Sequence, residues 1–101
     1  MSYKVVLSQH SFNQINQCVA FVNNVSKEAA LKLYKDIMEG VSSLEDMPLR
    51  CPVVDYLKLP FGSIRKLIIS NGRYALLFRV DKDVVYIDYF VDFRSEQLWK
   101  S

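Results

Sequence analysis

Basic side chains gather in one segment of the sequence, where they would suit an anionic partner. Residues 56–80 carry five basic side chains and no acidic one, whereas the flanking segments are slightly acidic. The five are Lys58, Arg65, Lys66, Arg73 and Arg79. Arginine binds phosphate through two parallel hydrogen bonds. The excess therefore indicates either a phosphate-bearing partner or a solvated sheet face that happens to be basic.

Common catalytic and nucleotide-binding motifs are absent from the sequence, including the Walker loop and the zinc-protease helix. His10 is the one histidine, and Cys18 and Cys51 lack partners at the spacing of zinc ligands. We therefore expect no metal and no cofactor. A ribonuclease could still work here without histidine, because arginine or lysine stabilises the charge that develops on a scissile phosphate.

Composition predicts one folded domain over residues 1–101. Half of the residues are hydrophobic and 24% are charged, which excludes an intrinsically disordered chain. No apolar run approaches the roughly 18 residues that a membrane span needs, and the first residues lack the apolar core of a signal peptide. Two cysteines are too few for a disulfide framework, which suits a reducing compartment. We expect a cytoplasmic protein with no membrane partner.

The pattern of apolar residues predicts two helices after a short first strand. We expect a strand over 3–7, a helix that begins at Ser8 or Ser11, and a second helix that begins at Ser26 and ends before Pro48. Very few residues separate the two helices. They should therefore form an antiparallel hairpin.

The second half of the sequence predicts an antiparallel meander. Residues 47–62 hold all three prolines and are expected to form an ordered loop. The three strands are expected over residues 64–70, 74–80 and 84–91. Asn71-Gly72 is a strong hairpin-turn signal, and residues 81–83 form the second turn. The predicted fold is α+β with the order β-α-α-β-β-β, an N-terminal helical hairpin packed on an antiparallel sheet.

Strict alternation along these strands predicts which side chains face away from the helices. The expected outer set is Arg73, Ala75, Leu77, Arg79, Tyr86, Asp88, Phe90 and Asp92, and the expected core face of the last strand is Val85, Ile87, Tyr89 and Val91. Arginines beside aromatic rings suit unpaired RNA, because the arginines bind phosphates and the rings stack on bases. An exposed apolar set with Leu77, Phe90 and Trp99 is equally typical of a protein-binding surface.

These residues, in this order, resemble the RelE/ParE superfamily of toxins from type II toxin–antitoxin systems. The resemblance covers nearly the whole chain. The matching stretches are Ser26-Lys-Glu-Ala-Ala with its helix to Ser43-Leu-Glu-Asp-Met-Pro48, then Ile64-Arg-Lys-Leu67, Arg73-Tyr-Ala-Leu-Leu-Phe-Arg-Val-Asp81 and Val84-Val-Tyr-Ile-Asp-Tyr-Phe-Val-Asp-Phe-Arg94. The helical hairpin and the strand that begins at Ile64 look closest to the ParE-like members.

The resemblance implies a small toxin that a cognate antitoxin neutralises by wrapping the sheet and helices. ParE-like members poison DNA gyrase, whereas RelE-like members cleave mRNA on the ribosome. We take the ParE-like activity, with its role in plasmid stabilisation, as the first hypothesis. The alternatives are a ribosome-dependent endoribonuclease and a degenerate member that is not toxic.

The RelE-like pattern has an arginine where this sequence has Ala75. In that pattern the arginine helps bind the scissile phosphate, so its loss argues against RNA cleavage. If the chain is a ribonuclease, the resemblance and the basic segment together suggest Lys66, Arg73, Arg79 and Arg94 as catalytic residues. The residues expected to bind a protein partner are Arg65, Leu77, Tyr86, Phe90 and Trp99.

Overall fold

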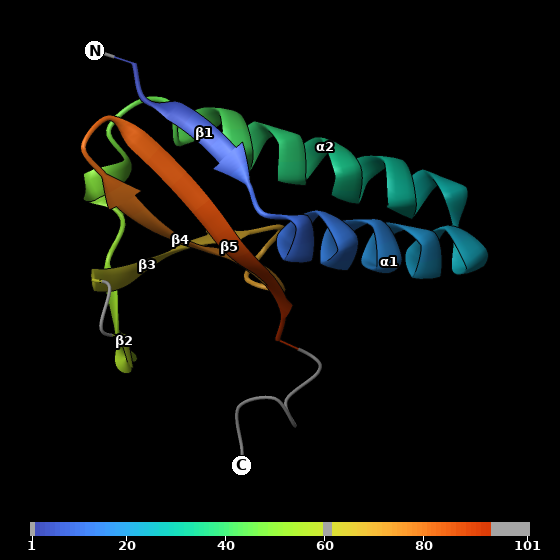
Figure 1. Ribbon diagram of the computed structural model, residues 1–101. Coiled ribbons are helices and arrows are strands. Elements are labelled where there is room, and N and C mark those ends of the chain that lie inside the picture. Colours follow the sequence, from blue (N-terminus) through green and yellow to red (C-terminus); the bar gives the residue numbers. More distant parts are fainter. Residues whose placement is uncertain (1, 60–61, 94–101) are drawn as a thin grey trace.

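The chain folds into a helical hairpin packed on one face of a five-stranded sheet (Figure 1). The computed structural model describes residues 2–59 and 62–93. The elements are β1 (Lys4–Leu7), α1 (Gln9–Val25), α2 (Lys27–Ser43), the short 3₁₀ helix η1 (Pro48–Arg50), β2 (Val53–Leu59), β3 (Gly62–Ile69), β4 (Tyr74–Asp81) and β5 (Val84–Asp92). The predicted α+β class, with its helical hairpin, is confirmed.

The sheet has the strand order β1-β5-β4-β3-β2. Strands β2 to β5 form an antiparallel meander, and β1 pairs with β5 in parallel, so the sheet is mixed rather than wholly antiparallel. The turn between β3 and β4 has positive φ at Asn71 (59°) and Gly72 (85°), as the predicted hairpin turn requires.

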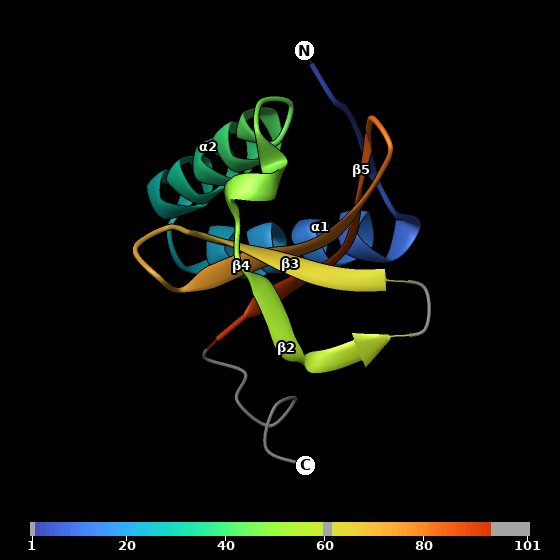
Figure 2. The same ribbon diagram turned by 90° about the vertical axis from the view of Figure 1, so that its left-hand side faces the viewer.

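Strand β2 corrects the expectation of a loop over residues 47–62. Pro48 begins η1 and Pro52 immediately precedes β2, so neither proline removes a hydrogen bond from the strand. The strand lies at the edge of the sheet, and its pairing with β3 shifts register between Val53 and Lys58. Figure 2 shows β2 bending as it crosses below β3.

A single serine separates the two helices. The Ser26 backbone is extended (φ −156°), so α1 ends there with the Ser26 N–H donating to the Val22 carbonyl. The Ser26 hydroxyl then accepts from the Ala29 N–H and caps α2. At the start of α1, Ser8 caps the helix in the same way. Ser11, the other predicted cap, lies inside α1.

The main hydrophobic core lies between the helices and the sheet. Ile37 and Leu44 from the α2 region meet Phe78 of β4 and Ile87 of β5 there, all of them fully buried. Gly40 brings α2 close to the sheet, because a Cβ at this position would lie 3.0 Å from the Ile69 Cγ2 atom. The helical hairpin therefore covers one face of the sheet closely.

A second apolar cluster covers the opposite face of the sheet. It consists of Val54, Ile64, Ala75, Leu77 and Val91, with Phe93 packed against it. The expectation that Leu77 lies exposed on an outer surface is therefore wrong. Strand β4 contributes to both clusters, so its residues from Tyr74 to Phe78 are all buried.

A β-bulge at Asp88 reverses the alternation of side chains along β5. Leu77 pairs with Tyr89 while Phe78 pairs with Ile87, so Asp88 is an extra residue in β5. Beyond the bulge, Phe90 is buried against the helices, where its ring stacks on Tyr74 with centroids 5.4 Å apart. The expected outward position of Phe90 is wrong for this reason.

Candidate functional site at the bulge

Arg79, Tyr86 and Asp88 form a compact polar unit on the face of the sheet opposite the helices. The Arg79 Nε atom donates to Asp88 Oδ2 at 2.9 Å, and the guanidinium carbon lies 4.8 Å from the centre of the Tyr86 ring. Tyr86 lies beside Arg79 because the two residues pair directly across β4 and β5. All three side chains are partly exposed, so they are accessible to a partner.

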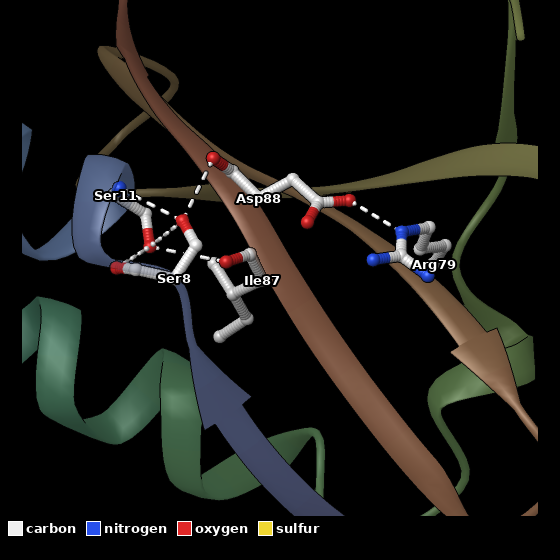
Figure 3. Close-up of polar contacts among 5 residues, drawn as sticks. All are labelled: Ser8, Ser11, Arg79, Ile87 and Asp88. Carbon is white, nitrogen blue, oxygen red and sulfur yellow. Dashed lines mark hydrogen bonds and ion pairs between the residues drawn. The ribbon is translucent and has the colours of Figure 1, made fainter.

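The start of α1 holds the bulge in place. The Ser11 hydroxyl lies 3.0 Å from both the Ser8 and the Ile87 carbonyl oxygens, and the Ser8 hydroxyl lies 3.1 Å from the Asp88 carbonyl oxygen. Figure 3 shows these contacts on one side of β5 and the Asp88 carboxylate reaching Arg79 on the other. The helix cap thereby fixes the strand residue that orients Arg79.

Beside this unit is an open hollow of about 370 Å³. Its lining residues are Ser8, His10, Arg79, Asp88 and Tyr89. The His10 and Tyr89 rings meet edge to face with centroids 5.4 Å apart. The hollow combines a cation, a carboxylate and two aromatic rings, a composition that suits protein recognition, because Tyr and Arg are enriched at interface hot spots.

The other predicted basic residues do not converge on this hollow. Arg73 lies six positions from Arg79, which is roughly 20 Å along an extended strand. Lys66 pairs with Leu77 across β3 and β4, and its side chain is partly buried. Arg94 and Trp99 lie outside the described residues.

Arg65 is partly exposed, and its guanidinium contacts the segment that precedes β2. Its Nη1 atom donates to the Cys51 carbonyl at 2.6 Å and to the Leu49 carbonyl at 3.3 Å. The guanidinium therefore ties η1 and its following residue to β3. These contacts give Arg65 a structural role, and its contact with a protein partner stays a prediction.

No metal site is indicated in the part of the chain that the structure describes, and the buried Cys51 thiol is not activated. Within it, no group of three or more His, Cys, Asp or Glu side chains is placed to hold a metal ion. Burial raises the pKa of the Cys51 thiol, which keeps this cysteine protonated and unreactive. Neither α1 nor α2 has the length and apolar character to cross a membrane.

Sequence reasoning missed three members of the hollow, His10, Asp88 and Tyr89, as a group. Asp88 was placed on the correct face, but nothing in its neighbours signals a bulge. Tyr89 was expected in the core, whereas 41% of it is exposed. His10 follows the Ser8 cap by two residues. If both the cap and the bulge had been predicted, His10 could have been placed beside Tyr89 of β5.

Comparison with known proteins gives a structural match without a sequence match. No family model matches the sequence, and no curated protein matches it. The fold is that of a ParE-like α+β protein. The matching chain belongs to a solved structure described as "Chromosomal ParDE TA system from P. aeruginosa", with a TM-score of 0.71 and 18% sequence identity over 90% of this chain and 96% of that chain. The fold that the resemblance implied is thus confirmed.

Proposed function

We propose that this chain is the toxin of a type II toxin–antitoxin pair, a ParE-like inhibitor of DNA gyrase that a cognate antitoxin neutralises. The ParE-like fold supports a toxin, and the residue pattern of the resemblance supports the ParE-like side. On this proposal the chain acts by binding a protein. Arg79, Tyr86 and Tyr89 at the bulge are the side chains that would contact it.

The buried state of Ala75 is the observation that favours a protein-binding toxin over a ribonuclease. Ala75 is 0% exposed and lies in the second apolar cluster, paired with Ile68 on one side and Val91 on the other. The RelE-like pattern places a phosphate-binding arginine at this position. Here the same place on the sheet is filled by hydrophobic packing, so no polar side chain is present at this position to bind a scissile phosphate.

The endoribonuclease remains the second candidate because two basic side chains stay on that face. Lys66 and Arg79 are both partly exposed, and Arg79 lies over an aromatic ring. An enzyme built on them would still need a general base. The only histidine, His10, lies in the hollow with Asp88.

Induced expression in a bacterium that lacks the antitoxin tests the proposal. DNA, RNA and protein synthesis would be followed by pulse labelling over the first minutes. Early arrest of DNA synthesis with a DNA-damage response is the expected result. Early arrest of protein synthesis with fragmented transcripts would establish the ribonuclease, and unimpeded growth with soluble protein present would identify a degenerate member.

Substitution of Arg79 tests the contribution of the bulge to toxicity. We expect Arg79→Ala to relieve growth arrest, whereas Lys35→Ala, which removes an equal charge from an exposed position on α2, leaves it unchanged. Circular dichroism and a thermal melt would show that both variants fold. Full toxicity of a folded Arg79→Ala variant would remove the bulge from the proposed site.

A further inference from the structure

The two most exposed large hydrophobic side chains of the described residues lie beside one cleft. Val25 at the end of α1 is 81% exposed, and Phe21, one turn earlier, is 68% exposed. The helices do not need these side chains for packing, because Val22 and Leu33 already contact the main core. Isolated exposed hydrophobics are common, but two that border the same cleft indicate a surface that another molecule covers.

The cleft lies between the end of the helical hairpin and the β3–β4 turn. It has a volume of about 410 Å³. Its lining residues are Phe21, Val22, Val25, Ala29, Lys32, Leu33, Ser70, Asn71, Arg73 and Tyr74. Leu33 and Tyr74 are buried and form its base, whereas Phe21 and Val25 form an exposed wall. This volume accommodates one or two bulky side chains of a partner.

The charged residues at the cleft are both basic. Lys32 and Arg73 line it, and no aspartate or glutamate does. The Lys32 ammonium lies 3.2 Å from Asp36 Oδ2, so its charge is partly compensated. Arg73 is exposed, and its guanidinium makes no hydrogen bond or ion pair with the other described residues. The turn fixes its position, because the Arg73 N–H donates to the Ser70 carbonyl and the Arg73 carbonyl accepts from Phe93.

We infer that this cleft binds an acidic, apolar segment of a protein partner. One or two bulky apolar side chains of the segment would enter between Phe21, Val25 and Tyr74. A carboxylate beside them would pair with Arg73, which is positioned at the rim. A nucleic acid fits less well, because the walls are apolar and Phe21 is the one exposed aromatic ring beside the cleft.

This docking surface is separate from the hollow at the bulge and does not depend on the toxin function. No residue is shared between the linings of the two sites. Arg73 lies at the N-terminal side of β4 and Arg79 near its other end. The two arginines that were expected to act together therefore belong to different surfaces, and their effects can be measured independently.

A peptide titration of the full chain tests the inference. The probe is a fluorescein-labelled peptide of leucine and glutamate, and its twin carries lysine in place of glutamate. Binding would be followed by fluorescence anisotropy, and ¹⁵N-labelled protein would locate the site by backbone amide shifts. We expect saturable binding of the acidic peptide alone, with the largest shifts at Val25, Lys32 and Arg73.

Variants then separate the apolar contact from the charge contact. Phe21→Ser and Arg73→Glu should each weaken binding of the acidic peptide by about tenfold or more. Lys35→Glu, which makes the same charge change at an exposed position outside the cleft, should change it less than about twofold. Both Phe21 and Arg73 are exposed, so the variants are expected to fold like the wild-type chain.

Several outcomes would overturn the inference. One is that the lysine peptide binds as tightly as the acidic peptide, and another is that the amide shifts centre on Arg79. A third is that a single-stranded RNA oligonucleotide binds the same cleft more tightly than the acidic peptide. A fourth is that the amide shifts at Phe21 depend on protein concentration in the absence of peptide. The last would show that a second copy of this chain covers the cleft. A chain that arrests growth but does not bind the acidic peptide would refute the docking surface and leave the proposed function standing.

Discussion

Ser11 shows how much one hydroxyl contributes to the bulge. It is the one buried polar side chain found among the described residues, and its hydroxyl contacts the Ile87 and Ser8 carbonyl oxygens. Each of these carbonyls also accepts a backbone N–H, from Ser8 and from Phe12 respectively, so the hydroxyl adds a second hydrogen bond that links α1 to β5. The position of Asp88, and with it the orientation of Arg79, therefore depends on a residue of α1.

We predict that Ser11→Ala lowers the free energy of unfolding by about 0.5 to 1.5 kcal/mol, because the buried hydroxyl hydrogen bond to β5 is lost while the Ile87 carbonyl keeps the Ser8 N–H as a donor. Urea denaturation measures the loss. Ser42→Ala, an exposed serine in α2, is the matched control and should change stability by less than about 0.5 kcal/mol. Equal stability of the two variants would mean that water replaces the hydroxyl at the bulge.

Asp36 gives the fold a dependence on acid pH. The pKa of Asp36 is lowered, first by the hydrogen bond from the Ser70 hydroxyl and then by the one from Lys32. A carboxyl with a lowered pKa in the folded state contributes stability that is complete above the unfolded value of about 3.9. That contribution disappears as the pH falls through the folded pKa.

We therefore expect Asp36→Asn to be less stable than the wild-type chain at neutral pH, with the difference vanishing toward pH 2. Thermal melts across this range would measure it. The control is Glu39→Gln on the same face of α2. The Glu39 carboxylate makes only a long, exposed ion pair with Lys35, at 3.9 Å, so this substitution should lack the pH dependence. If the difference in stability between Asp36→Asn and the wild-type chain persisted at pH 2, it would come from the introduced asparagine amide and not from the lost carboxylate charge.

At the scale of the elements, the sequence correctly predicted those helices and turns that are determined by residues close to one another in the chain. Ser8 and Ser26 are side-chain caps with a known preference, so both helices were placed correctly. Asn71-Gly72 fixed the β3–β4 hairpin for the same kind of reason. Strand β2 was missed because an edge strand with shifted register needs little regular pairing and carries no alternation of its own.

The candidate site was predicted less completely than the fold, and the bulge at Asp88 explains most of the difference. Alternation predicted the correct face of the sheet for Tyr86 and for its β4 partner Arg79, because Tyr86 lies before the bulge, and also for Asp88, which forms the bulge. It failed at Tyr89 and Phe90, which follow it. The bulge is held by hydroxyls about 76 to 80 residues away in sequence, so no local pattern in β5 could announce it.

Arg65 connects η1 to the sheet and should matter for stability rather than for recognition. We predict that Arg65→Ala lowers the free energy of unfolding by about 1 to 2 kcal/mol, because the Cys51 carbonyl loses a charged donor at 2.6 Å. Urea denaturation measures it, and Lys35→Ala serves as the control. If Arg65→Ala left stability unchanged but abolished toxicity, Arg65 would be a residue that binds the protein partner.

The whole molecule is a sheet with hydrophobic packing on both faces, and Ala75 lies in the smaller of the two clusters. Restoring the arginine of the RelE-like pattern at this position should therefore unfold the protein instead of creating a nuclease. We predict that Ala75→Arg costs more than about 4 kcal/mol, because it buries a charge without a partner.

Ile68→Arg is the matched control for this prediction. Ile68 pairs with Ala75 across β3 and β4 but is 43% exposed, so the same side chain should be tolerated there at a cost below about 1 kcal/mol. Soluble yield and thermal melts compare the two variants. A folded Ala75→Arg protein that cleaves RNA would reverse the proposed choice between gyrase and mRNA.

The parallel pairing of β1 with β5 also has a consequence for how the chain is made. Lys4 pairs with Val84, and the Ser8 N–H donates to the Ile87 carbonyl. Strand β1 can therefore join the sheet only after β5 has been synthesised. At roughly 5 to 20 residues per second, a ribosome needs several seconds to supply the intervening segment. During that time the helical hairpin is available while its sheet is incomplete. The contacts that orient Arg79 form only after β5 has been synthesised, so any activity that depends on them waits for that strand.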